Sequence, residues 1–237
     1  MTTSARLAAL SDRGRVSDHN EDCYATHDDL WIVADGMGGH ASGEVASRVA
    51  VDSVVRSLTE MAPDRALVEQ LRDAVVGARG ALLDHVRASP QDAGMGTTLV
   101  TAARRGEELA VAWVGDSRAY LLDDDRLQLL TTDHNVAEEM LALGMIDAEQ
   151  ARTHPGQYRL TRALSGDSDI DATPDAVSVP ARGRLLLCSD GLNGELSADT
   201  IGGLLGEADP GTAARALVHA ALDAGGRDNV TVVVVDL

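Results

Sequence analysis

The sequence predicts an α+β fold in which antiparallel strands and separate helices share one core. Three short β-patterned runs follow one another through turns of a few residues, at 97–103, 108–114 and 118–122. Connections this short exclude crossover helices, so these runs are expected to form an antiparallel meander. Helical patterns lie outside it, at 44–60, 63–88 and 210–224. The separation of strand and helix patterns favours α+β over alternating βαβ units.

The amino-terminal part predicts two short strands, at 5–11 and 23–28, and then a buried one. Leu30–Val33 are four consecutive apolar residues, two of them β-branched, which indicates a core strand. The apolar run ends at Asp35, which three glycines follow within four positions. Glycine lets backbone approach a ligand closely, and a neighbouring Asp can hold a cation. This stretch is therefore a candidate metal platform.

The helical patterns differ in their expected limits. Residues 44–60 repeat small apolar side chains every fourth position, a narrow face suited to packing on a sheet. The second helix is expected to begin at Pro63 and to end before Pro90. For the third, Asp209 is a good N-cap and Pro210 a good first-turn residue.

The remaining chain predicts a surface excursion and three further strands. Residues 133–168 hold a helical stretch around 135–151 that Gly144 and other residues interrupt, and they are polar enough to lie on the surface. Strands are expected at 176–179, 184–188 and 230–235. With no internal repeat or linker, residues 1–237 are expected to form a single domain.

Composition narrows the classes of partner. Lys and Arg total 20 against 38 Asp and Glu, a formal charge of -18, and every one of the 20 is an arginine. This balance argues against nucleic acid and anionic membrane as partners. Cys23 and Cys188 lie far apart, which suggests neither a disulfide framework nor a zinc site. The start lacks a signal peptide and no apolar run reaches membrane-spanning length, so a soluble cytoplasmic protein is expected.

Acidic residues recur where β-patterned runs begin or end: Glu21, Asp22, Asp35, Asp116, Asp190 and Asp228. Asp and Glu are seldom buried alone, so these side chains must be solvated, paired with Arg or bound to metal. If the strands align, their ends converge. Oxygen ligands without His or Cys at useful spacing favour magnesium or manganese over zinc. Any one such Asp by itself is more often a turn or cap residue.

Short motifs follow one another in a distinctive order along nearly the whole chain: Ser11-Asp12-Arg13-Gly14, Asn20-Glu21-Asp22, Ala34-Asp35-Gly36-Met37-Gly38-Gly39-His40, Gly96-Thr97-Thr98, Val114-Gly115-Asp116-Ser117-Arg118, Thr132-Asp133-His134, Leu160-Thr161-Arg162-Ala163-Leu164, Ser189-Asp190-Gly191-Leu192 and Arg227-Asp228-Asn229-Val230-Thr231. In this order and spacing the chain resembles the metal-dependent Ser/Thr protein phosphatases, the PPM or type-2C family, in its compact bacterial form. Each motif alone is weak, and their shared order carries the resemblance.

The resemblance implies a four-layer α-β-β-α sandwich, in which helices flank two antiparallel sheets and a binuclear metal centre lies at one end. It implies two Mn²⁺ or Mg²⁺ ions per chain and a possible third. The first ion would be held by Asp35, Asp190 and Asp228. The second would be held by Glu21, Asp35 and the carbonyl oxygen of Gly36. Asp116, with Asp190, would hold the third, and Asp22 would orient metal-bound water from behind the ligands.

The activity that the resemblance implies is hydrolysis of phosphoserine and phosphothreonine in proteins, by direct attack of a hydroxide that bridges the two metals. The expected partners are phosphorylated proteins that Ser/Thr kinases produce, in bacterial signalling, and the expected state is a monomer. The alternative is a pseudophosphatase, a phosphoprotein-binding module with weak or no turnover. The matched metal ligands argue against that alternative, whereas Ser17 keeps it open.

Two positions depart from the family pattern. Ser17 stands where the family usually has the arginine that binds the substrate phosphate, a role serine cannot imitate, and weaker phosphate affinity is expected. Arg13 and Arg15 are possible substitutes. Met37 stands where some members have a His that donates a proton, which leaves His40 as the candidate general acid. A lone His after a glycine turn is more often structural.

The excursion at 133–168 matches the family's flap, a segment beside the metal site that helps to select substrates. On the flap, His134, His154 and Arg162 are candidate contacts for the phosphoprotein. The alternative, that they brace the flap against the body of the domain, is at least as well supported by the sequence.

Overall fold

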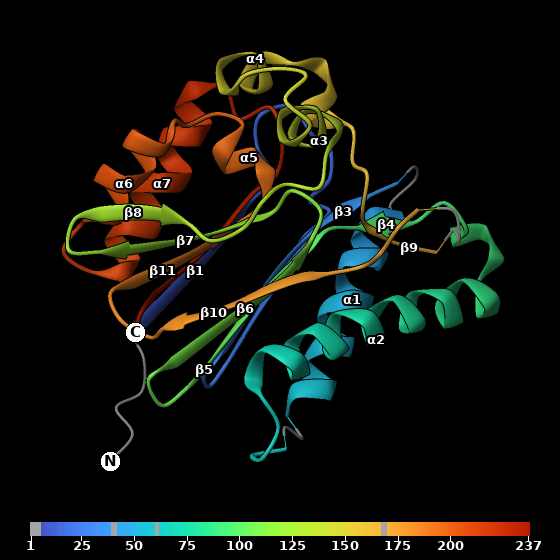
Figure 1. Cartoon of the computed structure of the whole chain (residues 1–237). Helices are drawn as coiled ribbons and strands as arrows, with labels where there is room; N and C mark the ends of the chain where they lie inside the picture. The colour runs from blue at the N-terminus through green and yellow to red at the C-terminus, as the bar shows by residue number, and fades with distance from the viewer. Residues whose placement is uncertain (1–5, 39–41, 60–61, 167–169) are drawn as a thin grey trace.

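Two antiparallel β-sheets face each other at the centre of a computed structural model that describes residues 6–38, 42–59, 62–166 and 170–237 (Figure 1). Among these residues one sheet has five strands, in the order β1 (Arg6–Asp12), β12 (Val230–Asp236), β11 (Arg184–Cys188), β7 (Arg118–Asp123) and β8 (Arg126–Leu129). The other has seven: β10 (Asp175–Pro180), β6 (Glu108–Val114), β5 (Leu99–Arg105), β3 (Leu30–Met37), β4 (Gly96–Thr97) and β9 (Leu164–Ser165) in order, with β2 (Asp22–His27) paired to β3.

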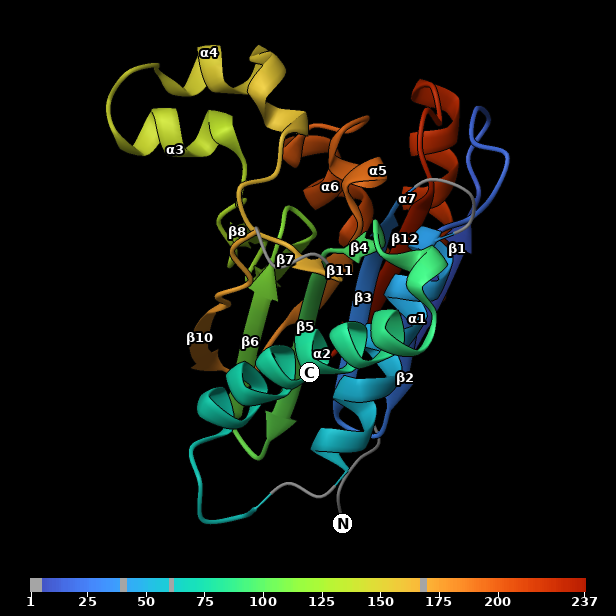
Figure 2. The same cartoon turned by 90° about the vertical axis from the view of Figure 1, so that its right-hand side faces the viewer.

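Helices cover the outer face of each sheet: Figure 1 shows the layers edge-on, and Figure 2 looks onto the helices that cover the seven-stranded sheet. The seven-stranded sheet packs against α1 (Ser42–Leu58) and α2 (Leu67–Ala88). The five-stranded sheet packs against α5 (Asp190–Asn193), α6 (Ala198–Leu205) and α7 (Pro210–Ala224). This arrangement confirms the expected α-β-β-α sandwich. The flap, with α3 (Val136–Ala142), α4 (Ala148–Thr153) and the 3₁₀ turn Pro155–Tyr158, lies at one end of it.

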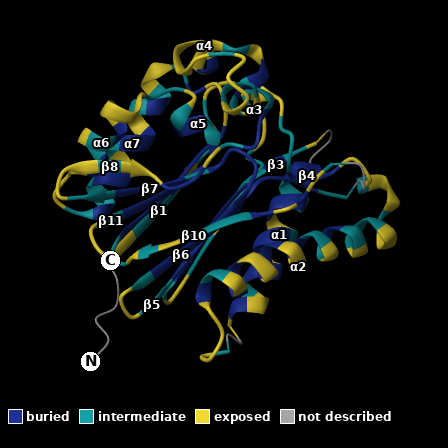
Figure 3. Ribbon diagram, viewed as in Figure 1, coloured by how far each residue is buried: buried dark blue, intermediate teal, exposed yellow. Residues whose placement is uncertain are grey.

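The alternation of side chains along β3 explains how the core positions a carboxylate. Trp31 and Val33 are fully buried between the two sheets, whereas Ile32 packs with residues of α1 and α2. Side chains of a strand alternate between its faces, so Asp35 shares the inner face with Trp31 and Val33. The apolar core between the sheets therefore ends at an acid. Figure 3 shows the buried strands at the centre and the exposed residues on the outer helices and the flap.

The predicted three-stranded meander is wrong at its third strand. β5 and β6 form the expected antiparallel hairpin, but β7 belongs to the other sheet, where it pairs with β11. The turn between β6 and β7 carries the chain across the sandwich, and Gly115 in that turn has a φ of 100°. A Cβ on Gly115 would lie 2.6 Å from the side chain of Thr98. Asp116 consequently lies at the crossing between the sheets.

Other limits differ from the expectation in smaller ways. Helix α2 begins at Leu67 instead of Pro63, since Ala66 still has an extended ψ of 132°. The Gln70 side chain accepts a hydrogen bond from Ala62 N and donates one to the Ala62 carbonyl, which holds the preceding loop in place. Gly144 separates α3 from α4 with a φ of 68°, as its position in the helical stretch indicates. The sequence patterns do not predict β8, β9, α5 or α6. None of the helices in the described residues has the length and apolar character of a membrane span.

Candidate metal centre

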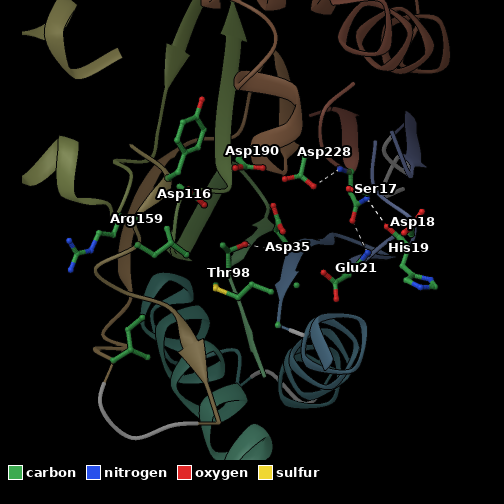
Figure 4. Close-up of a pocket in the computed structure, with 17 residues that line it drawn as sticks. Ser17, Asp18, His19, Glu21, Asp35, Thr98, Asp116, Arg159, Asp190 and Asp228 are labelled. Atoms are coloured by element: carbon green, nitrogen blue, oxygen red, sulfur yellow. Dashed lines mark hydrogen bonds between the residues drawn. The ribbon is translucent and has the colours of Figure 1, made fainter. Parts of the chain in front are cut away.

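A cavity of about 830 Å³ opens at the end of the sandwich where the flap lies (Figure 4). Residues at or beside strand ends of both sheets line it, together with residues of the flap. Its described wall carries six acidic residues: Asp18, Glu21, Asp35, Asp116, Asp190 and Asp228. Five of these are the acids predicted as metal ligands, so the ends of strands far apart in the sequence do converge on one space. Gly36, expected to offer its carbonyl, also lines the cavity.

Asp35 is held by the break between β4 and β5. Its backbone nitrogen donates to Thr98 Oγ1 at 3.1 Å, and its carbonyl accepts hydrogen bonds from Thr98 N and Thr97 Oγ1, each at 2.9 Å. Burial, followed by the charges of Asp22 and Asp190, raises the pKa of Asp35 well above its usual range. The carboxyl is thus fixed in place where its charged form needs a compensating cation.

Glu21 and Gly36 meet at the first turn of α1. The Gly36 nitrogen donates to the Glu21 carbonyl at 3.2 Å. A Cβ on Gly36 would overlap the carbonyl oxygens of Glu21 and Gly43, so only glycine permits this close approach. Burial raises the pKa of Glu21, and a hydrogen bond from the Gly43 backbone partly opposes that rise. The helix start therefore orients the Glu21 carboxylate.

Asp190 and Asp228 come from neighbouring strand ends. Asp190 follows β11 as the first residue of α5, and Asp228 precedes β12. Burial and then the charge of Asp228 raise the pKa of Asp190 to about 6. Asp190 Oδ1 is buried and has no hydrogen-bond partner among the described residues. Asp228 Oδ1 accepts a hydrogen bond from Asn229 N at 2.8 Å.

Asp22 lies behind these acids and is not part of the cavity wall. Its Oδ2 accepts a hydrogen bond from Ser189 Oγ at 2.8 Å, and burial raises its pKa to about 7. Its Oδ1 is buried without a partner among the described residues. One oxygen of Asp22 is therefore fixed and the other remains available to accept a hydrogen bond.

Asp116 is coupled to Asp35 through one threonine. Thr98 Oγ1 and Ser117 Oγ are hydrogen-bonded at 2.7 Å, so the threonine that holds Asp35 also holds the turn that carries Asp116. Asp116 is 8% exposed, and burial followed by the charge of Asp190 raises its pKa well above its usual range.

The donor set fits divalent metal ions. Burial raises the pKa of Asp35, Asp116 and Asp190, and the charge of Asp190 adds to the rise at the other two. Buried oxygens of Asp22 and Asp190 lack hydrogen-bond partners in the described chain. Such groups are stabilised by protons or by cations, and oxygen donors suit Mg²⁺ and Mn²⁺. Within the described residues no three His, Cys, Asp or Glu side chains form a group already arranged to hold an ion. The conclusion that divalent metal ions fit this site accordingly rests on the charge of its acids and on their unpaired oxygen atoms.

Ser17 lines the cavity, whereas the two nearby arginines are engaged elsewhere. Arg13 Nη1 donates to the Asp18 carbonyl at 3.2 Å and so braces its own loop. Arg15 bonds to α7, with Nε 2.6 Å from the Leu222 carbonyl and an ion pair to Asp223. Neither arginine lines the cavity, so neither supplies the guanidinium that is missing at position 17.

Asn229 holds this loop, a role that the sequence does not indicate. Its Oδ1 accepts a hydrogen bond from Glu21 N at 2.7 Å, and its Nδ2 donates to the carbonyls of Arg13 and His19, each at 2.9 Å. The motif at residues 227–231 draws attention to Asn229, but its partners lie more than 200 positions away. Only the fold brings them together.

The three flap residues predicted as substrate contacts lie outside the cavity wall. His134 Nδ1 accepts a hydrogen bond from Gly115 N at 3.1 Å, and burial lowers the pKa of this imidazole. Arg162 lies 3.4 Å from Asp175, and His154 Nδ1 accepts from Gly156 N at 3.0 Å. The contacts of His134 and Arg162 with the body of the domain favour the bracing role, whereas the hydrogen bond of His154 stays within the flap.

Other flap residues border the cavity instead. Tyr158, Arg159 and Leu160 line it, and no motif in the sequence singles out the first two. Met37 also lines it. His40, the candidate general acid, lies outside the described residues, so its expected role stays a prediction.

Comparison with known proteins agrees with this arrangement. The model of the family described as protein phosphatase 2C matches residues 13–210. Serine/threonine protein phosphatase PstP of Mycobacterium tuberculosis (strain CDC 1551 / Oshkosh) is 39% identical over 237 residues, which is 100% of this chain and 46% of that protein. Serine/threonine phosphatase stp of Listeria welshimeri is 34% identical over 235 residues, covering 95% of this chain and 93% of that protein.

A crystal structure supports the same assignment. The catalytic domain of serine/threonine protein phosphatase PstP, in complex with two manganese ions, superposes with a TM-score of 0.88 at 37% identity, covering 98% of both chains. This chain spans about half the length of the mycobacterial relative, 46%. With the family model matching most of its residues and the same fold at this identity, the chain belongs to the protein phosphatase 2C family.

Proposed function

We propose that this chain is a metal-dependent protein Ser/Thr phosphatase that hydrolyses phosphoserine and phosphothreonine in proteins. The observation that carries the proposal is the convergence of five predicted ligand acids on one open cavity at the end of the sandwich. The mycobacterial and listerial relatives are both named serine/threonine phosphatases. The same comparisons do not favour a module that only binds phosphoproteins.

The proposed ligand sets follow the positions of the acids. Asp35, Asp190 and Asp228 would hold one ion, and Glu21, Asp35 and the Gly36 carbonyl a second. Asp116 and Asp190 would hold a third. Mn²⁺ or Mg²⁺ bound there would supply Lewis acidity and a water molecule of lowered pKa.

The chain's own residues contribute position and polarity. The hydrogen bonds of Thr98 and Asn229 fix Asp35 and Glu21, so that little reorganisation is needed when a substrate arrives. Asp22 offers one unpaired oxygen as a hydrogen-bond acceptor behind the acids. Ser17 presents a hydroxyl at the rim where a phosphate would lie, and a hydroxyl binds phosphate more weakly than a guanidinium.

The biological setting belongs to the same proposal. Residues 1–237 would form one catalytic domain with the flap as part of it, working as a monomer in the cytoplasm. Its substrates would be proteins phosphorylated by Ser/Thr kinases. His40 remains the candidate proton donor to the leaving group.

The test is metal-dependent turnover. Purified chain is expected to release phosphate from a phosphothreonine peptide and from p-nitrophenyl phosphate with Mn²⁺, and to lose activity in EDTA. Asp190→Ala should reduce the rate at least about 100-fold and weaken Mn²⁺ binding by calorimetry. Asp199→Ala, a matched change of an exposed acid on α6, should do neither. Failure of the wild-type chain to turn over either substrate, with retained phosphopeptide binding, would support the binding module instead.

A further inference from the structure

One arginine, Arg159, lines the acidic cavity in the described part of the chain. The same wall carries six acids, and the whole chain has a formal charge of -18. A phosphorylated protein is an anion, so the parts of this acidic surface that lie away from bound metal ions repel it. A fixed positive charge at the rim would therefore affect which phosphoproteins are captured, the more so because position 17 holds a serine.

Arg159 differs from Arg118 and Arg162 in having an uncommitted guanidinium, and it differs from Arg152 of α4 in lining the cavity. Arg118 is bound to Asp133 through Nε and Nη2, and Arg162 pairs with Asp171 and Asp175. Within the described residues, the Arg159 side chain makes no ion pair or hydrogen bond, and it is exposed. It is thus available to a ligand without breaking an existing contact.

The backbone of Arg159 is anchored although its side chain is not. Its nitrogen donates to the Gly156 carbonyl at 3.2 Å, and its carbonyl accepts from Val136 N at 3.0 Å. These bonds join the 3₁₀ turn Pro155–Tyr158 to the start of α3. A residue held in this way presents its side chain from a defined point, which reduces the ordering that binding requires.

The direction of the side chain separates two possible ligands. Figure 4 shows the Arg159 guanidinium turned away from Asp35, Asp190 and Asp228. It therefore faces the polypeptide around a phosphorylated residue, not the phosphate that would lie among the carboxylates. The neighbouring Tyr158 is 70% exposed and adds apolar surface on the same rim. A guanidinium fork matches a carboxylate or a second phosphate in two parallel hydrogen bonds.

We propose that Arg159 is a specificity-determining residue that binds an acidic side chain flanking the phosphorylated residue of the substrate. The chain accordingly prefers phosphoproteins whose phosphosite lies beside Asp, Glu or a second phosphorylated residue. This inference rests on the proposed phosphatase function and specifies the substrate class of that site.

The experiment compares two phosphothreonine peptides that differ only in carrying Glu or Gln at the positions flanking the phosphothreonine. Wild-type enzyme with Mn²⁺ should show a kcat/KM about 5-fold higher for the Glu peptide, the effect of one exposed charge-assisted contact. Arg159→Gln should abolish the preference by raising KM for the Glu peptide, with kcat unchanged. Arg159→Lys should keep part of it. Turnover of p-nitrophenyl phosphate, which has no flanking residues, should be the same in all variants.

Arg152→Gln is the matched control, because Arg152 is exposed on α4 of the same flap and does not line the cavity. It should leave the preference intact. Equal loss in Arg152→Gln and Arg159→Gln would attribute the effect to net charge and overturn the inference. So would an unchanged preference in Arg159→Gln. In both cases turnover of p-nitrophenyl phosphate leaves the proposed function standing, whereas a wild-type chain inactive on all three substrates contradicts the proposed function itself.

Discussion

Asn229 fixes the position of Glu21 by accepting a hydrogen bond from its backbone nitrogen at 2.7 Å. The amide nitrogen of the same side chain donates to the carbonyls of Arg13 and His19. One buried side chain at the start of β12 thereby ties down the loop that carries Ser17 and the acid at its end. The cavity wall depends on this contact between residues 208 positions apart.

Asn229→Ala is expected to weaken Mn²⁺ binding by about 10- to 100-fold, the usual effect of removing a partner that orients a metal ligand. The measurement is calorimetric titration of metal-free protein with Mn²⁺. Asn135→Ala is the matched control, because Asn135 is also buried but caps α3 on the flap. That variant should lose stability and keep its Mn²⁺ affinity. Equal affinity in the wild type and Asn229→Ala would contradict the role given to Asn229.

Ser17→Arg is expected to lower KM for a phosphopeptide about 10-fold, because a guanidinium at this part of the wall can form two charge-assisted hydrogen bonds to a phosphate. The measurement is steady-state kinetics with Mn²⁺. Val16→Arg adds the same charge one position away, on a residue that is 68% exposed and does not line the cavity. A similar decrease in both variants would show a general effect of charge, and an unchanged KM in Ser17→Arg would refute the argument.

The sequence predicts the acids of the candidate site because they flank strong apolar strands. Asp35 follows an uninterrupted apolar run within β3, and Asp190 and Asp228 each stand two positions from the nearer end of β11 and β12. The strands predicted from these runs are present in the fold because their apolar side chains form the core between the sheets. The positions of the carboxylates relative to one another then follow from the closing of the sandwich.

Features that depend on contacts across the chain could not be predicted. A local pattern for β7 cannot tell which sheet the strand joins, because that choice depends on the turn at Gly115 and on pairing with β11. Helix α5 has four residues, too few for a periodic pattern. Arg159 has a sequence context like that of other surface arginines, and only its place on the cavity wall distinguishes it.

The metal-free protein is expected to become more stable as the pH falls from 8 to about 5.5. Burial raises the pKa of Asp22 to about 7 and that of Asp190 to about 6, whereas an unfolded Asp has a pKa of about 3.9. A carboxyl group whose pKa is raised by folding stabilises the folded state fully at pH values below its unfolded-state pKa. This stabilisation is lost as the pH rises through the folded-state pKa values, here about 6 and about 7. Bound cations offset the repulsion between the carboxylates, so Mn²⁺ should flatten the dependence.

Thermal unfolding in EDTA and in Mn²⁺ across this pH range provides the measurement. Subtracting one series from the other cancels the effect of titratable groups remote from the acids. His134 is such a group: burial lowers its pKa, so its effect on the pH dependence of stability has the opposite sign. Asp190→Asn should reduce the rise in Tm seen in EDTA. An identical rise in Tm with and without Mn²⁺ would exclude these carboxylates as its source.

Gly115→Ala is expected to destabilise the protein by about 3 kcal/mol, the combined cost of a positive φ and of overpacking against Thr98. Gly106→Ala is the matched control, since Gly106 also has a positive φ, 61°, but a Cβ there meets nothing within 4 Å. It should cost about 1–2 kcal/mol. Urea unfolding measures both free energies. Equal losses of stability in the two variants would show that the contact between a Cβ at position 115 and Thr98 costs no stability. The close packing of the turn that carries Asp116 against the strand end at Asp35 would then not be what excludes a side chain at position 115.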